Sequence, residues 1–192
     1  MSLLSAIASK KDELKPTKTV VTTVDGRKFV QTKNDCTEIA GSYGFVVDTE
    51  PDKTPAKVLD FLYVGSQDCC QLDVLIEHRI RYVLSVGVDA PVKHPEQVLK
   101  YKWVQCLDLP ETDIRSVLGV CNDFIREGIE KRFNVLVHCN AGVSRSTSIV
   151  IGYLMLMHNY SYIEAYNAVK VVRNCVKPNI GFELQLKELS KF

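Results

Sequence analysis

The sequence predicts an α/β domain in which a central, mostly parallel sheet is flanked by helices. From residue 57 onward, short runs of β-favouring residues alternate with segments whose apolar residues recur at helical spacing. Such alternation is typical of parallel strands joined by helical crossovers. The run from Ile149 to Met157 is apolar all round, which indicates a central buried helix. At 192 residues, the chain can form one such domain together with an extension.

The extension comes first along the chain. Residues 1–52 are mixed polar sequence with clustered lysines, and Pro51–Pro55 marks the expected boundary with a domain over residues 53–192. The dipeptide Asp25-Gly26 suits a type I′ turn, so a β-hairpin is expected between the runs on either side of it, Val20–Val24 and Lys28–Gln31. Because an isolated hairpin is only marginally stable in water, we interpret the extension as flexible.

The elements of the domain follow from the spacing of its apolar residues. Ser66 and Asp113 stand before two expected helices, where a side-chain oxygen can cap the first N–H groups. Cys69 and Cys70 lie on the first helix, where a packing role is favoured over a redox role. The expected strands are Lys57–Val64, Arg81–Val88, Tyr101–Leu107 and Val135–Val137, and the helices besides Ile149–Met157 are Gln67–Glu77, Ile114–Lys131, Tyr162–Arg173 and Phe182–Lys191.

Composition excludes several classes of function. A formal net charge of +1 does not fit a general binder of nucleic acid or membrane surfaces. The seven cysteines show no zinc-ligand spacing, and the N-terminal residues do not resemble a signal peptide. Reduced thiols in the cytoplasm or the nucleus fit this pattern best. We therefore expect no metal and no cofactor.

The motif that carries chemistry is VLVHCNAGVSRS, from Val135 to Ser146. A strand that turns directly into a helix leaves the first N–H groups of that helix unpaired at the positive end of its dipole, which makes an anion site. A helix N-terminus and a neighbouring arginine also favour the thiolate form of a cysteine such as Cys139. Arg145, separated from Cys139 by five residues, can bind two oxygens of one phosphoryl group. The pattern predicts phosphoryl transfer through a cysteine nucleophile.

The chain from Lys57 to its C-terminus resembles the dual-specificity protein phosphatases. HCNAGVSRS carries the resemblance, together with LDLPETDI before it and IVIGYLM and KPNIGF after it. It is similar to small atypical members that lack a rhodanese-like kinase-docking domain. The resemblance implies a protein tyrosine phosphatase-like fold and hydrolysis of phosphotyrosine and of phosphoserine or phosphothreonine. It also implies phosphorylated protein partners, among them MAP kinases of stress signalling or their upstream kinases.

The resemblance assigns roles to individual residues. Cys139 attacks phosphorus, while Arg145 and the backbone N–H groups of the loop hold the phosphoryl oxygens. Ser146 helps to expel the thiol, although a helix-start serine bonded to nearby backbone is the alternative. His138 orients the loop and tunes the thiol, or it is purely structural. The expected phosphate-binding residues are Asn140, Ala141, Gly142, Val143, Ser144 and Arg145.

Two aspartates compete for the role of general acid. Asp113 has a structural explanation as the cap of the helix that follows it. Asp108 ends the third expected strand, at the sheet edge where a parallel sheet also places Cys139. It stands 31 residues before Cys139, where the similar family has its acid. We favour Asp108.

Three functions stay open at this stage. The first is an active dual-specificity protein phosphatase, and the second is a weakly active scaffold that binds kinases or phosphoproteins through the same pocket. The third is a phosphatase of RNA 5′ ends or lipids, which the near-neutral charge disfavours. Residues 140–144 contain no Lys or Arg, unlike an inositol-phosphate site, and the chain has no Lys-Asn-Arg-Tyr loop to deepen the pocket for phosphotyrosine alone. The first function is favoured.

Overall fold

The computed structural model describes residues 19–22, 28–32, 35–38, 52–88 and 96–189. The chain divides into two units, Met1–Gly44 and Phe45–Phe192. In the first unit, β1 (Thr19–Thr22), β2 (Lys28–Gln31) and β3 (Cys36–Glu38) form an antiparallel sheet in that order. The expected hairpin is confirmed by the pairing of β1 with β2, whereas its turn at Asp25-Gly26 lies outside the described residues. The boundary at residue 52 and the flexibility of the extension stay predictions.

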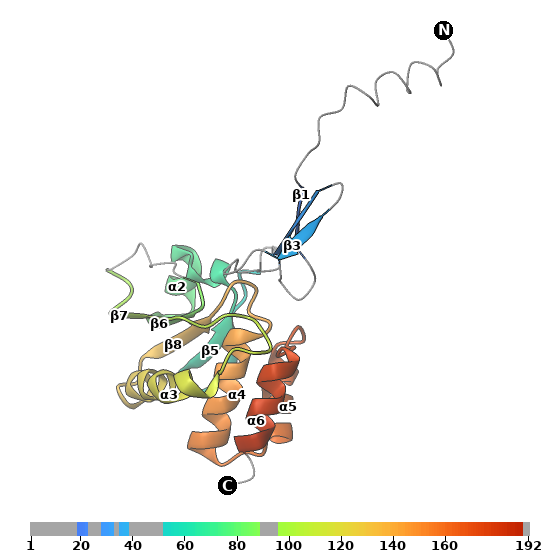
Figure 1. Ribbon diagram of the computed structural model, residues 1–192. Helices are drawn as coiled ribbons and strands as arrows, with labels where there is room; N and C mark the ends of the chain where they lie inside the picture. The colour runs from blue at the N-terminus through green and yellow to red at the C-terminus, as the bar shows by residue number, and fades with distance from the viewer. Residues whose placement is uncertain (1–18, 23–27, 33–34, 39–51, 89–95, 190–192) are drawn as a thin grey trace. The chain divides into compact units, whose positions relative to one another are not determined.

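The second unit contains a five-stranded sheet with helices on both faces, which confirms the predicted fold class (Figure 1). The strand order is β4-β5-β8-β6-β7, and only the edge strand β4 runs antiparallel to its neighbour. The strands are β4 (Ala56–Leu59), β5 (Leu62–Gly65), β6 (Ile80–Val86), β7 (Lys100–Val104) and β8 (Asn134–His138).

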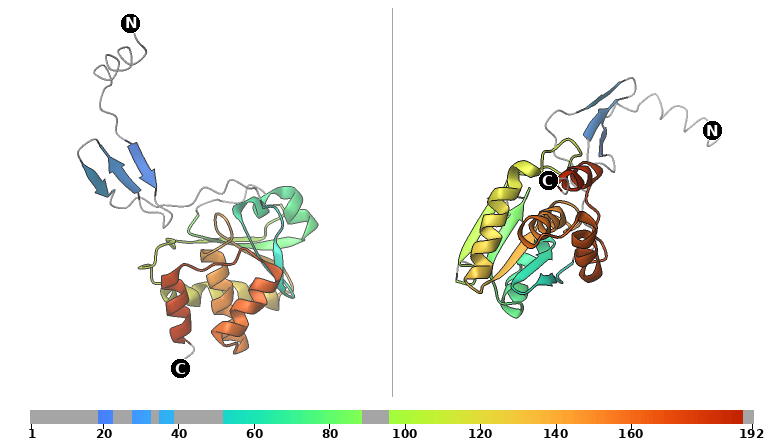
Figure 2. Two further views of the ribbon diagram at one scale, coloured as in Figure 1. Left: turned by 90° about the vertical axis from the view of Figure 1, so that its right-hand side faces the viewer. Right: turned by 90° about the horizontal axis from the view of Figure 1, so that it is seen from below.

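Helices cover both faces of this sheet. Four long helices lie on one face and the short α2 lies on the other, as Figures 1 and 2 show. The helices are η1 (Gln67–Cys70, a 3₁₀ helix), α2 (Leu72–Glu77), α3 (Arg115–Glu130), α4 (Arg145–His158), α5 (Tyr162–Val172) and α6 (Ile180–Leu189).

Two apolar clusters result, one on each face of the sheet. In the central strand β8, Val135 and Val137 belong to the cluster under the long helices, whereas Leu136 belongs to the cluster with Leu75 of α2. Side chains of a strand alternate between faces, so a strand buried on both sides is apolar at every position. The all-apolar run Val135–Val137 was therefore correctly predicted as a buried strand, and the structure places it at the centre of the sheet.

The parallel strands bring their carboxyl ends together at one edge. Gly65 at the end of β5 and Ser85 near the end of β6 both pair with His138, the last residue of β8. The next residue is Cys139, and α4 begins six residues later at Arg145. The register of the sheet thus places the nucleophile candidate where loops after three strands meet.

Several of the expected elements were wrong in extent. The strand expected over Tyr101–Leu107 is β7, which ends at Val104, so Asp108 lies in the loop after it. The single strand Lys57–Val64 is a hairpin of β4 and β5, which reverses at Asp60 and Phe61, where Phe61 has a φ of +66°. The sequence signals this turn only through Asp60, because a bulky residue such as Phe61 rarely adopts positive φ. The expected helix Gln67–Glu77 is divided at Gln71, whose backbone is extended. Ser66 does cap its first part by accepting the N–H of Asp68 at 3.1 Å.

The remaining helices match their predictions closely. In α4, residues 145–155 are buried, while Leu156 and Met157 are exposed. Ile114 occupies the cap position of α3, and Asp113 still accepts the N–H of Arg115 at 3.1 Å, as a capping side chain does. Cys69 is buried in the smaller cluster, which confirms the packing role. The seven cysteines of the chain are free thiols.

Candidate active site

The Cys139–Arg145 loop joins the end of β8 to the start of α4. Cys139 is 2% exposed, and its Sγ lies 3.3 Å from the Oγ of Ser146 in the first turn of α4. Because α4 begins at Arg145, the loop occupies the positive end of the helix dipole. The structure thus brings together the thiol, the helix N-terminus and the hydroxyl that the motif predicted.

The loop has its carbonyl groups bonded outward. The carbonyl of Asn140 accepts the N–H of Gln67 at 2.9 Å, and that of Val143 accepts the N–H of Lys177 at 2.9 Å. Between them, Arg173 donates to the carbonyls of Ala141 (3.0 Å) and Gly142 (2.7 Å). A trans peptide places its N–H opposite its carbonyl, so these bonds turn the N–H groups of residues 141–144 to the inner side of the loop. Inward N–H groups at a helix N-terminus form a cradle for a tetrahedral anion.

Gly142 is required by this shape of the loop. Its φ is +66°, a backbone conformation that side-chain-bearing residues rarely adopt. A Cβ on this residue would stand 2.5 Å from the backbone of Gly65 and 2.6 Å from Nη2 of Arg173. The glycine therefore permits both the turn and the close approach of the β5 end.

Arg145 is held above the loop by its surroundings. Its side chain is 8% exposed, and its Nε lies 3.5 Å from Oδ2 of Asp108. Gly87, just after β6, leaves the room for it, because a Cβ there would stand 2.5 Å from Nη1 of Arg145. A buried guanidinium at the mouth of an anion cradle is suited to bind phosphoryl oxygens in pairs.

Asp108 lies beside the loop and is held by two donors. Ser144 Oγ donates to its Oδ1 at 2.6 Å, and Asn179 Nδ2 donates to the same oxygen at 2.9 Å. Asn179 also donates its backbone N–H to Ser144 Oγ at 3.0 Å, which closes a three-residue network. Sequence reasoning missed Asn179, although the quoted KPNIGF motif contains it. The other acid candidate, Asp113, has a half-exposed side chain that pairs with Arg115.

His138 lies beneath the loop and is neutral. Burial above all, and the neighbouring Arg145, lower the pKa of His138 to about 4 against the opposing effect of a hydrogen bond to the backbone. Its Nδ1 lies 3.2 Å from the carbonyl of Cys139, and since a carbonyl only accepts, Nδ1 carries the hydrogen. An uncharged His138 adds no positive charge to the site.

Two other classes of site are not found in the described part of the chain. Among these residues, no group of three or more His, Cys, Asp or Glu side chains is placed to hold a metal ion. None of the helices there is long and apolar enough to cross a membrane.

Comparison with known proteins identifies the family. Residues 62–192 match the family described as dual specificity phosphatase, catalytic domain. The chain belongs to this family. Its resemblance to the dual-specificity phosphatases and the assignment as a protein tyrosine/serine/threonine phosphatase are thereby confirmed.

Relatives of this dual specificity phosphatase include small and large proteins. Dual specificity protein phosphatase 19 of Mus musculus, which the sequence motifs also suggested, is 35% identical over 189 residues, covering 94% of this chain and 86% of that protein. Dual specificity protein phosphatase MPK-4 of Drosophila melanogaster is 40% identical over 132 residues, which cover 66% of this chain but 33% of that protein. The chain therefore spans most of the first relative and about a third of the second.

Solved structures show the same fold. The crystal structure of DUSP15 is 32% identical with a TM-score of 0.67, and the match covers 72% of this chain and 88% of that one. The human tyrosine phosphatase-like serine/threonine/tyrosine-interacting protein is 27% identical with a TM-score of 0.66, covering 73% and 97%. The predicted protein tyrosine phosphatase-like architecture is confirmed by these neighbours.

Proposed function

We propose that this dual specificity phosphatase works through a phosphocysteine formed on Cys139. The observation that carries the proposal is the loop itself, which begins at a buried thiol, has inward N–H groups and ends at the buried Arg145. A transferring phosphoryl group spreads its charge over three equatorial oxygens, so catalysis depends on fixed donors around them. The inward N–H groups of residues 141–144 and the guanidinium of Arg145 supply such donors.

In the first step, Cys139 Sγ forms a bond to phosphorus as the ester P–O bond breaks. The leaving oxygen of a serine, threonine or tyrosine must gain a proton, and Asp108 donates it. Oδ1 of Asp108 accepts bonds from Ser144 and Asn179, so the proton is carried by Oδ2, which lies 3.5 Å from Nε of Arg145. General acid catalysis of this kind contributes about 10²–10⁴ in rate.

In the second step, water attacks phosphorus and the S–P bond breaks. Asp108, now ionised, accepts the proton of the attacking water and returns to its starting form. The thiolate leaves with its electron pair and is stabilised by a hydrogen bond from Ser146 Oγ, which lies 3.3 Å from the sulfur. The cycle needs no redox partner, since the protein ends as it began.

The experiment compares variants on substrates with different leaving groups. We expect metal-free hydrolysis of an aryl phosphate that Cys139→Ser abolishes while inorganic phosphate still binds, because a hydroxyl stays protonated there and is a poor nucleophile. Asp108→Asn should lower kcat by about 10²-fold or more on a phosphopeptide and far less on an aryl ester with an acidic leaving group. Its pH–rate profile should lose the decline toward basic pH. Full activity of the serine variant would contradict the mechanism.

Asp113→Asn is the matched control for the acid. Asp113 accepts the backbone N–H of Arg115 and is half-exposed, and an asparagine there can accept the same N–H, so this variant should keep both the stability and the leaving-group dependence of the wild type. If the two aspartate variants exchange phenotypes, the acid is Asp113.

We further propose phosphorylated MAP kinases of stress signalling, or their upstream kinases, as substrates in the cytoplasm or the nucleus. Resemblance to the family supports this proposal. Incubation with a doubly phosphorylated stress-activated MAP kinase, followed by mass spectrometry, should show loss of phosphate from both Tyr and Thr. Faster release from an RNA 5′ end or a phosphoinositide would refute the substrate class. Stable binding of the kinase without phosphate release would support the scaffold alternative.

A further inference from the structure

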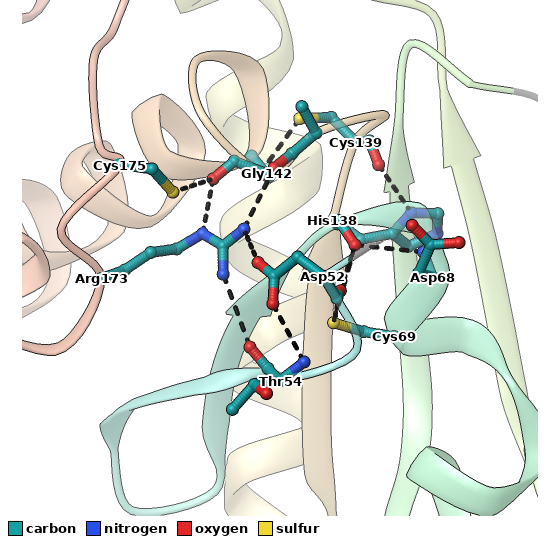
Figure 3. A network of polar contacts seen from close by, with 12 residues as sticks. Asp52, Thr54, Asp68, Cys69, His138, Cys139, Gly142, Arg173 and Cys175 are labelled. Atoms are coloured by element: carbon teal, nitrogen blue, oxygen red, sulfur yellow. Dashed lines mark hydrogen bonds and ion pairs between the residues drawn. The ribbon is translucent and has the colours of Figure 1, made fainter. Parts of the chain in front are cut away.

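Arg173 stands at the C-terminal end of α5, outside the catalytic motif, and is 5% exposed. A buried guanidinium is costly unless its donors are bonded and its charge is paired. Nε of Arg173 donates to the carbonyl of Gly142 at 2.7 Å, and Nη2 donates to that of Ala141 at 3.0 Å. Figure 3 shows the side chain reaching from its helix to the outer side of the Cys139–Arg145 loop. Two consecutive peptides of the loop are therefore held by one side chain.

The orientation of those two peptides matters for anion binding. Each bonded carbonyl points away from the cradle, and planarity of the peptide points the following N–H into it. The N–H groups concerned belong to Gly142 and Val143. Without Arg173, the carbonyls would be buried without a charged donor, and the peptides could rotate. Arg173 thus sets the direction of amide donors that a phosphoryl group would meet.

Arg173 is paired with Asp52, which lies 121 residues earlier in the chain. Nη2 of Arg173 lies 2.6 Å from Oδ2 of Asp52, and Nη1 donates to the carbonyl of Thr54 at 3.5 Å. Asp52 accepts the N–H of Thr54 through Oδ1 at 3.0 Å, so both carboxylate oxygens are occupied. The charge of the buried arginine is neutralised by Asp52, which lies four residues before the first strand of the five-stranded sheet, β4.

The backbone of Asp52 is fixed as well. Its carbonyl accepts Ser66 Oγ at 2.6 Å and the thiol of Cys69 at 3.3 Å. Burial raises the pKa of Cys69, which keeps the thiol protonated and able to donate. Asp52 is therefore anchored to the loop after β5 by its backbone and to Arg173 by its side chain, as Figure 3 shows.

We propose that Asp52 and Arg173 are a positioning pair for phosphate binding. Arg173 orients the peptides of the Cys139–Arg145 loop, and Asp52 orients Arg173. The segment just before β4 is then part of the machinery that shapes the site. The proposal rests on the proposed function of this loop as the phosphoryl site.

The experiment uses the full chain with Asp52→Asn, Arg173→Gln and the double variant. The readouts are the inhibition constant for inorganic phosphate, KM and kcat for an aryl phosphate, and the pH dependence of Cys139 alkylation by iodoacetamide. Charge-assisted bonds to the two carbonyls are lost in Arg173→Gln, so phosphate inhibition should weaken about tenfold or more. KM should rise, and alkylation should shift to higher pH. Asp52→Asn should change the same quantities in the same direction by a smaller factor.

Two comparisons make the result specific. The double variant should bind phosphate no more weakly than Arg173→Gln alone, because residues that act through one contact are not additive. Asp73→Asn is the matched control. Oδ2 of Asp73 lies 3.8 Å from Nζ of Lys53 in an exposed ion pair, and Lys53 is the residue that follows Asp52. It should leave phosphate inhibition and alkylation unchanged.

A purely structural role predicts a different result. Both variants would then melt at lower temperature while phosphate inhibition, KM and the alkylation profile of the folded protein stayed as in the wild type, which would overturn the proposal. If Arg173→Gln does not fold, Asp52→Asn decides, because its side chain is one-third exposed and the substitution is nearly isosteric. If Cys139→Ser retains turnover, the proposed function fails. If only the Arg173 and Asp52 variants behave like wild type, this inference alone fails.

Discussion

Protonation of His138 should make the stability of the catalytic unit fall in mild acid. The side chain is fully buried, and burial lowers its pKa from an ordinary 6.5 to about 4. Between these values the unfolded chain binds a proton that the folded chain does not, so the free energy of unfolding decreases as pH falls from 6.5 toward 4. At about 1.4 kcal/mol for each pH unit, the full effect is about 3 kcal/mol, and most of it is reached by about pH 4.5.

Urea unfolding at pH 7.5 and at pH 4.5 measures this effect in wild type and in His138→Asn. Asparagine can still donate to the carbonyl of Cys139 as Nδ1 does, but it does not titrate. The difference in the free energy of unfolding between wild type and His138→Asn should therefore shrink by about 2–3 kcal/mol as pH falls from 7.5 to 4.5. The other titrating groups contribute equally to both proteins, so their effects cancel in this difference. His158→Asn, at an exposed site, is the control and should keep the wild-type dependence. Parallel curves for wild type and His138→Asn would show that His138 is already protonated in the folded protein.

Two further substitutions probe the loop. Ser146→Ala should slow breakdown of the phosphocysteine more than its formation, since the Ser146 hydroxyl lies 3.3 Å from the leaving sulfur. Rapid-quench kinetics should show a larger burst of released phenol in this variant. Equal slowing of both phases would refute the role of Ser146. Gly142→Ala should destabilise the protein by about 1–2 kcal/mol from its φ of +66° alone, and it should weaken phosphate inhibition as the loop shifts. Gly119→Ala is its control, because a Cβ there meets nothing within 4 Å and should stabilise α3 by about 0.5–1 kcal/mol in thermal unfolding. Unchanged phosphate inhibition in Gly142→Ala would contradict the requirement for glycine in the loop.

Much of the fold was accessible from the sequence because its signals are local. The apolar run Val135–Val137 followed by a polar loop and a fully apolar segment predicted a buried strand, a turn and a buried helix. Five residues between Cys139 and Arg145, starting where the strand ends, predicted an anion-binding loop. Capping, periodicity and strand–turn–helix spacing depend on neighbours within a few residues, which a sequence displays directly. The hairpin at β4 and β5 was missed because its turn, at Asp60 and Phe61, contains no glycine or proline.

The partners of the loop were decided only by the tertiary structure. Asn179 meets Asp108 from 71 residues away, and Arg173 meets Gly142 from 31 residues away. Such long-range contacts produce no recognisable pattern in the sequence. They depend on which helices pack against the sheet and on how its strands are aligned with one another. The neutrality of His138 has the same origin, since burial rather than residue type lowers its pKa. The sequence alone indicated which residues to propose for binding and attacking a phosphoryl group, and long-range packing decided which residues hold them in place.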